Sequence, residues 1–149
     1  MRIPIKWKDD KEVVLAAVRH HGYALYDSSA RLKDDKDIIL TAVRLNGSLL
    51  SYAFARLRDD KEVVLTAVRH KGHILDYASK RLQNNKEVVE AALTSNIEAV
   101  THANIEVLPK LNLFLFTKEE REKIYLFYSE RIEEEDLFLL AKVKRHFLS

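Results

Sequence analysis

The segment that decides the fold runs from Asp59 to Gly72 and reads DDKEVVLTAVRHKG. Nearly the same sequence occurs 25 and 50 residues earlier, as DDKDIILTAVRLNG at 34–47 and DDKEVVLAAVRHHG at 9–22. A divergent fourth copy, NNKEVVEAALTSN, follows at 84–96. Self-similarity at a fixed period is typical of stacked repeat proteins, in which each unit packs only on its neighbours. The sequence therefore predicts an array rather than one globular core.

The first part of each unit is expected to be a short helix. Asp9-x-x-Glu12 and its equivalents are typical of a capping box, in which Asp accepts hydrogen bonds from the first amides and Glu reaches back. The apolar run at 13–18 then predicts a helix that is covered on most of its sides. The glycines that follow are expected to adopt the left-handed conformation of a helix C-terminus; they are Gly22, Gly47 and Gly72.

A second, slightly shorter helix is expected after each glycine. Its apolar or small residues recur three and four positions apart, which is the helical period. In the first three units these residues are Leu25, Ser28, Ser29 and Leu32; Leu50, Ala53, Phe54 and Leu57; and Leu75, Ala78, Ser79 and Leu82. Neither helix is long enough to be stable alone, so its stability has to come from stacking on the next unit.

These patterns predict an all-α, right-handed solenoid of about four 25-residue two-helix repeats plus a C-terminal helical cap, with boundaries at 9–33, 34–58, 59–83, 84–109 and 110–149. Residues 1–8 fall into register with the end of a repeat, since Trp7 lies 25 positions before Leu32. They are therefore either half a repeat or an N-terminal cap. We expect the whole chain to be a single structural domain.

The last part of the chain breaks the repeat and is rich in aromatic residues. Thr117-x-x-Glu120 is another capping box and predicts the start of a helix. The acidic run 133–136 predicts the first turn of a final helix that ends near 142–145, where cations favour the negative helix end. Two interpretations remain open for this helix pair. It either covers the apolar end of the array, or it docks a partner or a second copy of the chain.

Composition excludes several classes of protein. The net charge is only +2, so the chain lacks the excess of basic residues that marks most nucleic-acid and anionic-membrane binders. Cysteine is absent, which excludes disulfides and Cys-based metal sites. No run of about 18 apolar residues occurs, and the N-terminus lacks a secretory signal. We therefore expect a cytoplasmic protein, or one delivered to a host cytosol, with no membrane segment.

The repeated phrase D-K-E-V-V-L-x-A-V-R-x-x-G, followed by L-x-x-A-S-x-x-L and a further D-D-K, resembles the family catalogued as domain of unknown function forty-one sixteen. The resemblance covers roughly 9–108 and leaves out the last forty residues. It implies short tandem helical repeats, found in protists, large viruses and bacteria that live inside amoebae. It implies no activity and no catalytic residue.

Catalytic chemistry is not expected. None of the six histidines forms an H-E-x-x-H motif or an equivalent zinc-binding pattern. The recurring carboxylates are explained by capping at exposed helix starts, whereas acid–base catalysis needs a carboxylate in an apolar pocket. Three isolated glycines cannot build a phosphate-binding loop. We therefore expect no enzyme activity, no metal and no cofactor.

Stacking brings equivalent arginines into rows along the array. One row is Arg19, Arg44 and Arg69, and the other is Arg31, Arg56 and Arg81. Like charges in a row repel, so each row needs compensation. The compensation is either internal, from the capping acids and Glu90, or external, from an acidic protein surface or a nucleic-acid backbone.

Positions that differ between units are free to serve a partner. Around the turn and the second helix they are Tyr23, Tyr26, Asp27, Tyr52, His73, Asp76, Tyr77 and His102. Tyrosine and arginine are common anchors of protein interfaces. Tyr52 and Tyr77 occupy equivalent positions, so they are either such anchors or half-buried packing residues.

The sequence favours a non-catalytic protein-binding scaffold that uses the curved surface of the array. Such a scaffold would act as an adaptor, an inhibitor or an effector of an intracellular microbe, with a protein partner contacted by the variable residues and by Arg19, Arg44 and Arg69. The alternative is nucleic-acid or other polyanion binding through the stacked arginine rows, which the even charge makes less favourable.

Overall fold

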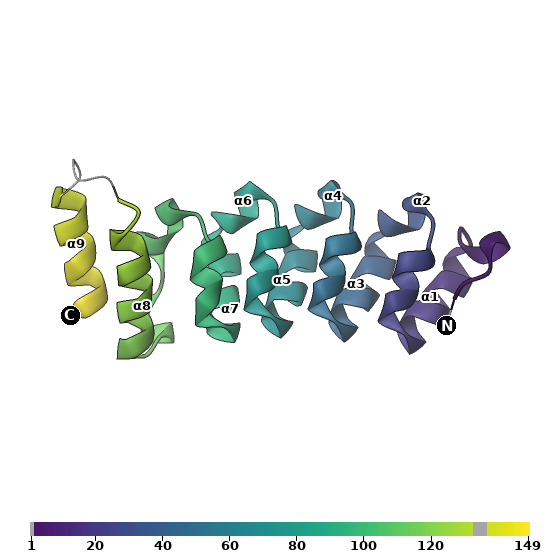
Figure 1. The fold of residues 1–149 in the computed structure, drawn as a ribbon, viewed down its shortest axis with the longest axis horizontal. Coiled ribbons are helices and arrows are strands. Elements are labelled where there is room, and N and C mark those ends of the chain that lie inside the picture. Colours follow the sequence, from purple (N-terminus) through teal and green to yellow (C-terminus); the bar gives the residue numbers. More distant parts are fainter. Residues whose placement is uncertain (1, 133–136) are drawn as a thin grey trace.

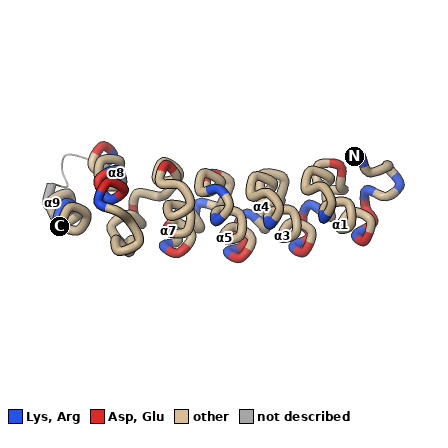
Figure 2. Tube along the Cα trace, turned by 90° about the horizontal axis from the view of Figure 1, so that it is seen from below, with Lys and Arg blue, Asp and Glu red and all other residues tan. Residues whose placement is uncertain are grey.

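The computed structural model describes residues 2–132 and 137–149. Its helices stack side by side along one axis, and the two ends of the chain lie at opposite ends of the stack (Figure 1). The described residues form helices and no strand, so the predicted all-α repeat solenoid is confirmed. The described helices follow an almost straight line in both views, whereas the sequence interpretation expected a curved array (Figure 2).

Each repeat has a ten-residue α-helix followed by a six-residue 3-10 helix, and the first three repeats add a single α-turn. The long helices are α1 (Lys11–His20), α3 (Lys36–Leu45), α5 (Lys61–His70) and α7 (Lys86–Ser95). The 3-10 helices are η2 (Gly22–Asp27), η3 (Gly47–Tyr52), η4 (Gly72–Tyr77) and η5 (Ile97–His102). The α-turns are α2 (Ala30–Lys33), α4 (Ala55–Arg58) and α6 (Lys80–Gln83). Flanking elements are η1 (Ile5–Trp7), η6 (Ile105–Lys110), η7 (Leu113–Leu115), α8 (Lys118–Ser129) and α9 (Leu137–Leu148).

The second helix of each unit is therefore not continuous, contrary to the prediction. Ser28 and Ser29 are extended, with ψ of 158° and 160°. The break lets the Ser29 amide donate to the Lys8 carbonyl of the preceding turn at 2.7 Å instead of bonding within its own helix. The same bond recurs along the array as Phe54 to Lys33, Ser79 to Arg58 and Asn104 to Gln83. The chain interrupts each second helix in order to join successive repeats through the backbone.

The core runs uninterrupted through the stack. Successive long helices contact one another, and so do successive 3-10 helices. Each long helix contributes a fully buried apolar pair, namely Val14 and Val18, Ile39 and Val43, Val64 and Val68, and Val89 and Leu93. A ten-residue helix is only marginally stable alone in water, so burial of these side chains between neighbours is what keeps it folded.

The helix caps lie one residue later than predicted. Asp10, Asp35, Asp60 and Asn85 are the N-caps, and their side chains accept from backbone amides two or three residues ahead. Asp9, the expected cap, instead accepts from the Ser29 hydroxyl and from Arg31 Nε, both at the entrance to the next long helix. Two adjacent aspartates thus divide two tasks: Asp10 caps α1, and Asp9 joins the start of α1 to the start of α2.

The glycines also differ from the prediction, because none of the glycines has a positive φ. His21, Asn46 and Lys71 end the long helices in extended conformation, and each glycine begins a 3-10 helix. What requires glycine is close approach. A Cβ added at Gly47 would lie 2.5 Å from the carbonyl oxygen of Ala67, and one at Gly72 would lie 2.2 Å from that of Ala92.

The C-terminal helix pair packs on the end of the stack. The predicted capping box is confirmed, because Thr117 and Glu120 each accept from the other's amide. Helix α8 contacts η5 and η6, and the buried side chains of Ile124, Tyr128 and Phe147 extend the core beyond the repeats. Helix α9 runs to Leu148 rather than ending near 142–145, and the acidic run 133–136 lies outside the described residues. No described helix has both the length and the apolar character needed to cross a bilayer.

Replacing Gly47 or Gly72 with alanine is expected to destabilise the fold by about 1–3 kcal/mol, because the new methyl group meets a backbone carbonyl that cannot move away. Gly22→Ala is the matched control. Its Cβ would meet Leu49 Cδ1 at 2.6 Å, and a side-chain end can rotate aside. Chemical denaturation should rank Gly22→Ala as clearly the mildest of the three. Equal midpoints for the three variants would contradict the close-approach explanation.

Candidate functional site

The structure places the predicted site residues in two rows along the array. One row consists of the successive 3-10 helices η2 to η5, here called the 3-10 ladder, and it carries Tyr23, Tyr26, Tyr52, His73, Tyr77 and His102. Arg19, Arg44 and Arg69 lie near the ends of α1, α3 and α5. In Figure 1 the 3-10 helices stand behind the long helices.

The tyrosines on the 3-10 ladder differ in how available they are. Tyr23 and Tyr26 are 60% and 62% exposed, and Tyr77 is 40% exposed. Tyr52 is half-buried and packs on the core, with its ring edge-to-face with that of Tyr26 at 5.8 Å between centroids. The Tyr23 hydroxyl accepts from Asn46 Nδ2 at 3.1 Å. Tyr52 is thus mainly a packing residue, whereas the other three present an aromatic surface to solvent.

The histidines on this ladder hold no recognisable catalytic arrangement. His73 is exposed, and His102 is half-buried with Nδ1 lying 3.4 Å from Asp76 Oδ1. Within 2–132 and 137–149, no group of three or more His, Asp or Glu is placed to hold a metal ion.

One arginine row is compensated inside the array. Arg31, Arg56 and Arg81 pair with Asp9, Asp34 and Asp59, with nitrogen–oxygen distances of 3.0, 3.2 and 3.0 Å. The internal compensation predicted for this row is therefore confirmed. In the fourth repeat both partners change together, and Asn84 Nδ2 donates to Glu106 Oε2 at 3.1 Å. A polar pair is therefore kept at the same place in every unit, although the residues that form it differ.

The other arginine row is exposed at all three positions. Arg69 borders a hollow of about 410 Å³ with residues of α7 and with Leu115. Glu87, also on its rim, is held by Lys61, and the hydrogen bond from that ammonium group lowers the pKa of Glu87. A carboxylate with a lowered pKa is a weaker base than an ordinary one.

A lysine ladder also joins the long helices, and the sequence had not indicated it. Lys11 Nζ lies 2.8 Å from both Asp35 and Asp37, and Lys36 Nζ lies 2.8 Å from Asp60 and 2.9 Å from Glu62. The carboxylate hydrogen bonds raise the pKa of Lys11 and of Lys36. Figure 2 shows the result, with acidic and basic residues interspersed along the array and not collected into one basic stripe.

These pairs predict that the free energy of unfolding is highest over a middle range of pH and falls at both the acidic and the basic limit of that range. Burial alone would raise the pKa of Asp60, but hydrogen bonds from Lys36 and the amides of Val63 and Glu62 bring it below its ordinary 3.8. A lowered carboxylate pKa adds stability that is present above the ordinary value and is lost as pH falls through the lowered one. The raised lysine pKa values add stability that is present below about 10.5 and is lost above it.

Asp60→Asn is expected to lower the thermal midpoint at neutral pH by an amount equivalent to about 1 kcal/mol or less, because the ion pair is partly exposed. Asparagine keeps the cap, as Asn85 does naturally. Wild type and variant should converge in melting experiments as the pH falls below the ordinary 3.8 of the carboxyl. A difference that stays constant down to pH 2 would argue against the Lys36 pair as its source.

Phe54 is the clearest departure from the repeat that the sequence interpretation missed. It was assigned to an apolar helix face, yet it is 46% exposed and starts α4 without a side-chain cap. The equivalent residues Ser29 and Ser79 both cap their α-turns and donate to an aspartate. Arg56 Nη2 lies 3.2 Å from Asp34 Oδ1 but is not oriented to donate, so that buried oxygen lacks a hydrogen bond. Comparing aligned repeats could have revealed this position.

Phe54→Ser is expected to leave stability unchanged or to raise it by up to about 1 kcal/mol, because the new hydroxyl can cap α4 and donate to Asp34. The matched control is Ser79→Ala, which removes those two contacts from the next repeat. That control should lose about 0.5–2 kcal/mol in denaturant titrations. A large loss for Phe54→Ser would show that the ring contributes more by packing than its exposure suggests.

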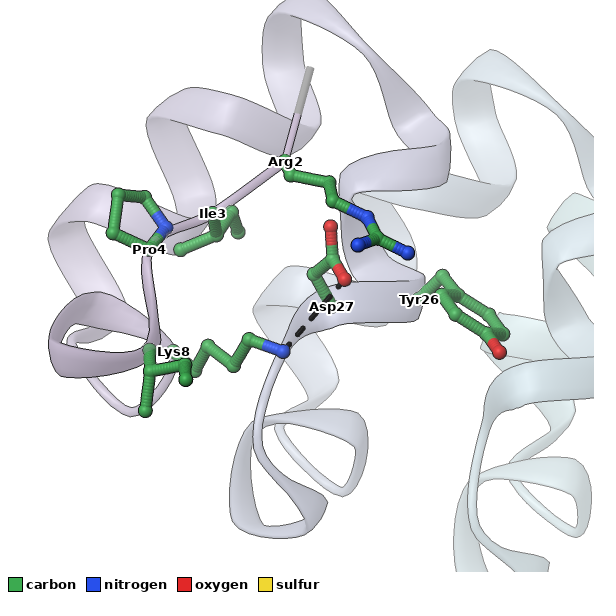
Figure 3. A pocket seen from close by; sticks show the side chains of 7 residues that line it. Arg2, Ile3, Pro4, Lys8, Tyr26 and Asp27 are labelled. Carbon is green, nitrogen blue, oxygen red and sulfur yellow. Dashed lines mark ion pairs between the residues drawn. The ribbon is translucent and has the colours of Figure 1, made fainter.

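A second hollow, of about 570 Å³, lies at the N-terminal end of the array (Figure 3). Residues 2–5 and Lys8 form one side, and Tyr26 and Asp27 of η2 form the other. Lys8 Nζ lies 3.7 Å from Asp27 Oδ1. Of the residues predicted to contact a partner, Tyr26 and Asp27 border this hollow.

The comparisons with known proteins identify repeats without identifying a function. A family model described as "Domain of unknown function (DUF4116)" matches twice in tandem, at 10–58 and 60–108. Each match spans two of the 25-residue units, and together they cover about two thirds of the chain. No curated protein and no solved structure matches the chain.

Proposed function

Because the chain belongs to the tandem-repeat family described as a domain of unknown function (DUF4116), which brings no assigned activity, we propose from the surface itself that it is a non-catalytic protein-binding scaffold. The observation that carries the proposal is the contrast between the recurring charged residues and the variable aromatic residues. The charged positions that recur in every unit are largely engaged in pairs between repeats, whereas the 3-10 ladder keeps aromatic side chains exposed at positions that differ from unit to unit.

This contrast favours a protein partner for a physical reason. Exposed aromatic rings offer a large contact area at a small cost in side-chain entropy, and they are enriched at the centres of protein interfaces. The stacked repeats hold Tyr23, Tyr26 and Tyr77 on a rigid support, so little order has to be created on binding. A scaffold of this kind would serve as an adaptor, an inhibitor or an effector of an intracellular microbe.

Polyanion binding has weaker support. Arg31, Arg56 and Arg81 are already paired with aspartates, which leaves one exposed row at the ends of the long helices. Sequence-independent binding to nucleic acid depends on unpaired cations that can replace counterions on phosphates. The acidic groups interspersed along the array would oppose such binding.

Affinity capture from native lysate, followed by mass spectrometry, tests the proposal. The full chain is expected to retain one stoichiometric protein, and the double variant Tyr23→Ala/Tyr77→Ala should lose it while melting like the wild type, because both rings are exposed. Leu126→Ala is the matched control, since Leu126 is 56% exposed and lies on α8, outside the helices η2 and η4 that carry the two tyrosines. Steeply salt-dependent recovery of bulk RNA or DNA, with no protein, would contradict the proposal.

A further inference from the structure

The hollow at the N-terminal end has an apolar wall and an opening to solvent. Ile3 is buried, but Ile5 is 88% exposed and Tyr26 is 62% exposed, so both offer uncovered apolar surface at the hollow. Its volume of about 570 Å³ lies within the range of sites that hold organic ligands, and it exceeds what one large side chain needs. The adjoining ring of Tyr52, edge-to-face with Tyr26, continues the aromatic surface onto the next repeat.

The charge around the hollow is unbalanced, unlike that of the rest of the array. Arg2 and Lys8 are the cations on its lining. Lys33 adds a third cation nearby, with its ammonium 5.6 Å from the centre of the Tyr26 ring. Asp27 is the one acidic residue on the lining, and its contact with Lys8 is long at 3.7 Å.

The orientation of these groups suits an incoming carboxylate. Figure 3 shows Arg2 and Lys8 reaching into the hollow from two sides toward Asp27, with Tyr26 beyond them. Among the described residues Arg2 forms no ion pair, so its guanidinium is available to a ligand. A guanidinium favours a carboxylate because the two planar groups match in a bidentate pair.

We propose that this hollow binds an acidic segment of a partner protein. An apolar side chain of that segment occupies the hollow against Ile5 and Tyr26, and carboxylates beside it pair with Arg2 and with Lys33 or Lys8. The inference rests on the proposed protein-binding function and specifies the chemistry of the partner. An apolar wall rimmed by cations fits a peptide side chain with acidic neighbours better than it fits a phosphate backbone, which has no apolar group to place there.

Selection from a random dodecapeptide phage library on the immobilised full chain provides the probes. Enriched peptides are expected to contain an apolar residue flanked by Asp or Glu. Fluorescein-labelled copies should bind the wild type in anisotropy titrations. Affinity should fall by about tenfold or more for Arg2→Glu and for Tyr26→Ala, and it should weaken with added salt. Arg145→Glu at the other end of the chain makes the same charge change and should have no effect.

Three outcomes would overturn the inference. They are the enrichment of basic or neutral peptides, binding that is unaffected by Arg2→Glu and Tyr26→Ala, and a library that yields no binder. A labelled oligothymidylate that binds with the same dependence on Arg2 would assign the hollow to a polyanion and would also overturn it. Capture of a protein that is lost on Tyr23→Ala/Tyr77→Ala but kept on Arg2→Glu leaves the proposed function standing and removes this inference alone.

Discussion

The close approach of neighbouring repeats is the constraint on which the rest of the structure depends. Gly47 and Gly72 begin their 3-10 helices so near the carbonyls of Ala67 and Ala92 that a single methyl group would clash. At that separation a backbone amide of each repeat can also donate to a carbonyl of the preceding one. Helices of ten residues become stable because the neighbours complete them. The ion pairs between lysines and aspartates form at the same joints and stabilise what packing has already positioned.

This constraint separates structural positions from available ones. Most recurring residues face a neighbour and are fixed by it, the exposed Arg19, Arg44 and Arg69 excepted. On the 3-10 ladder, by contrast, Tyr23, Tyr26 and Tyr77 are exposed to solvent. Phe54 is a variable, exposed residue at a position that is otherwise structural. Its ring replaces a capping serine and leaves an aspartate oxygen without a donor. A residue that gives up local stability for an exposed ring is a reasonable place to look for recognition.

The architecture could be predicted from the sequence because a period of 25 residues and a run of buried apolar side chains leave few alternatives. The local geometry of each unit could not be predicted in the same way. A spacing of three and four is compatible with a 3-10 helix followed by an α-turn as well as with one helix, so the break at Ser28 and Ser29 was invisible. Two adjacent aspartates are equally good caps by sequence, and only the contact of Asp9 with Arg31 decides between them.

The candidate surfaces were predictable to a similar degree. Tyr23, Tyr26 and Tyr77 were found by their variation and are exposed, whereas the packing of Tyr52 depends on a neighbouring repeat. The hollow beside Tyr26 arises where the first eight residues, which have no helical repeat of their own, fold back on η2. No spacing rule within a unit could indicate it, because its two walls lie on either side of α1 in the chain.

The hydrogen-bonded pair Asn84 and Glu106 distinguishes the fourth unit from the other three. Three joints use aspartate and arginine, and chains built from interchangeable joints can slip by one unit or exchange segments with another copy while folding. A mismatched pairing would set Asn84 opposite an arginine of another unit, which replaces an ion pair with a weaker hydrogen bond, or an aspartate opposite Glu106, which brings like charges together. The divergent pair of the fourth unit therefore favours the correct register over pairing with equivalent residues of another unit.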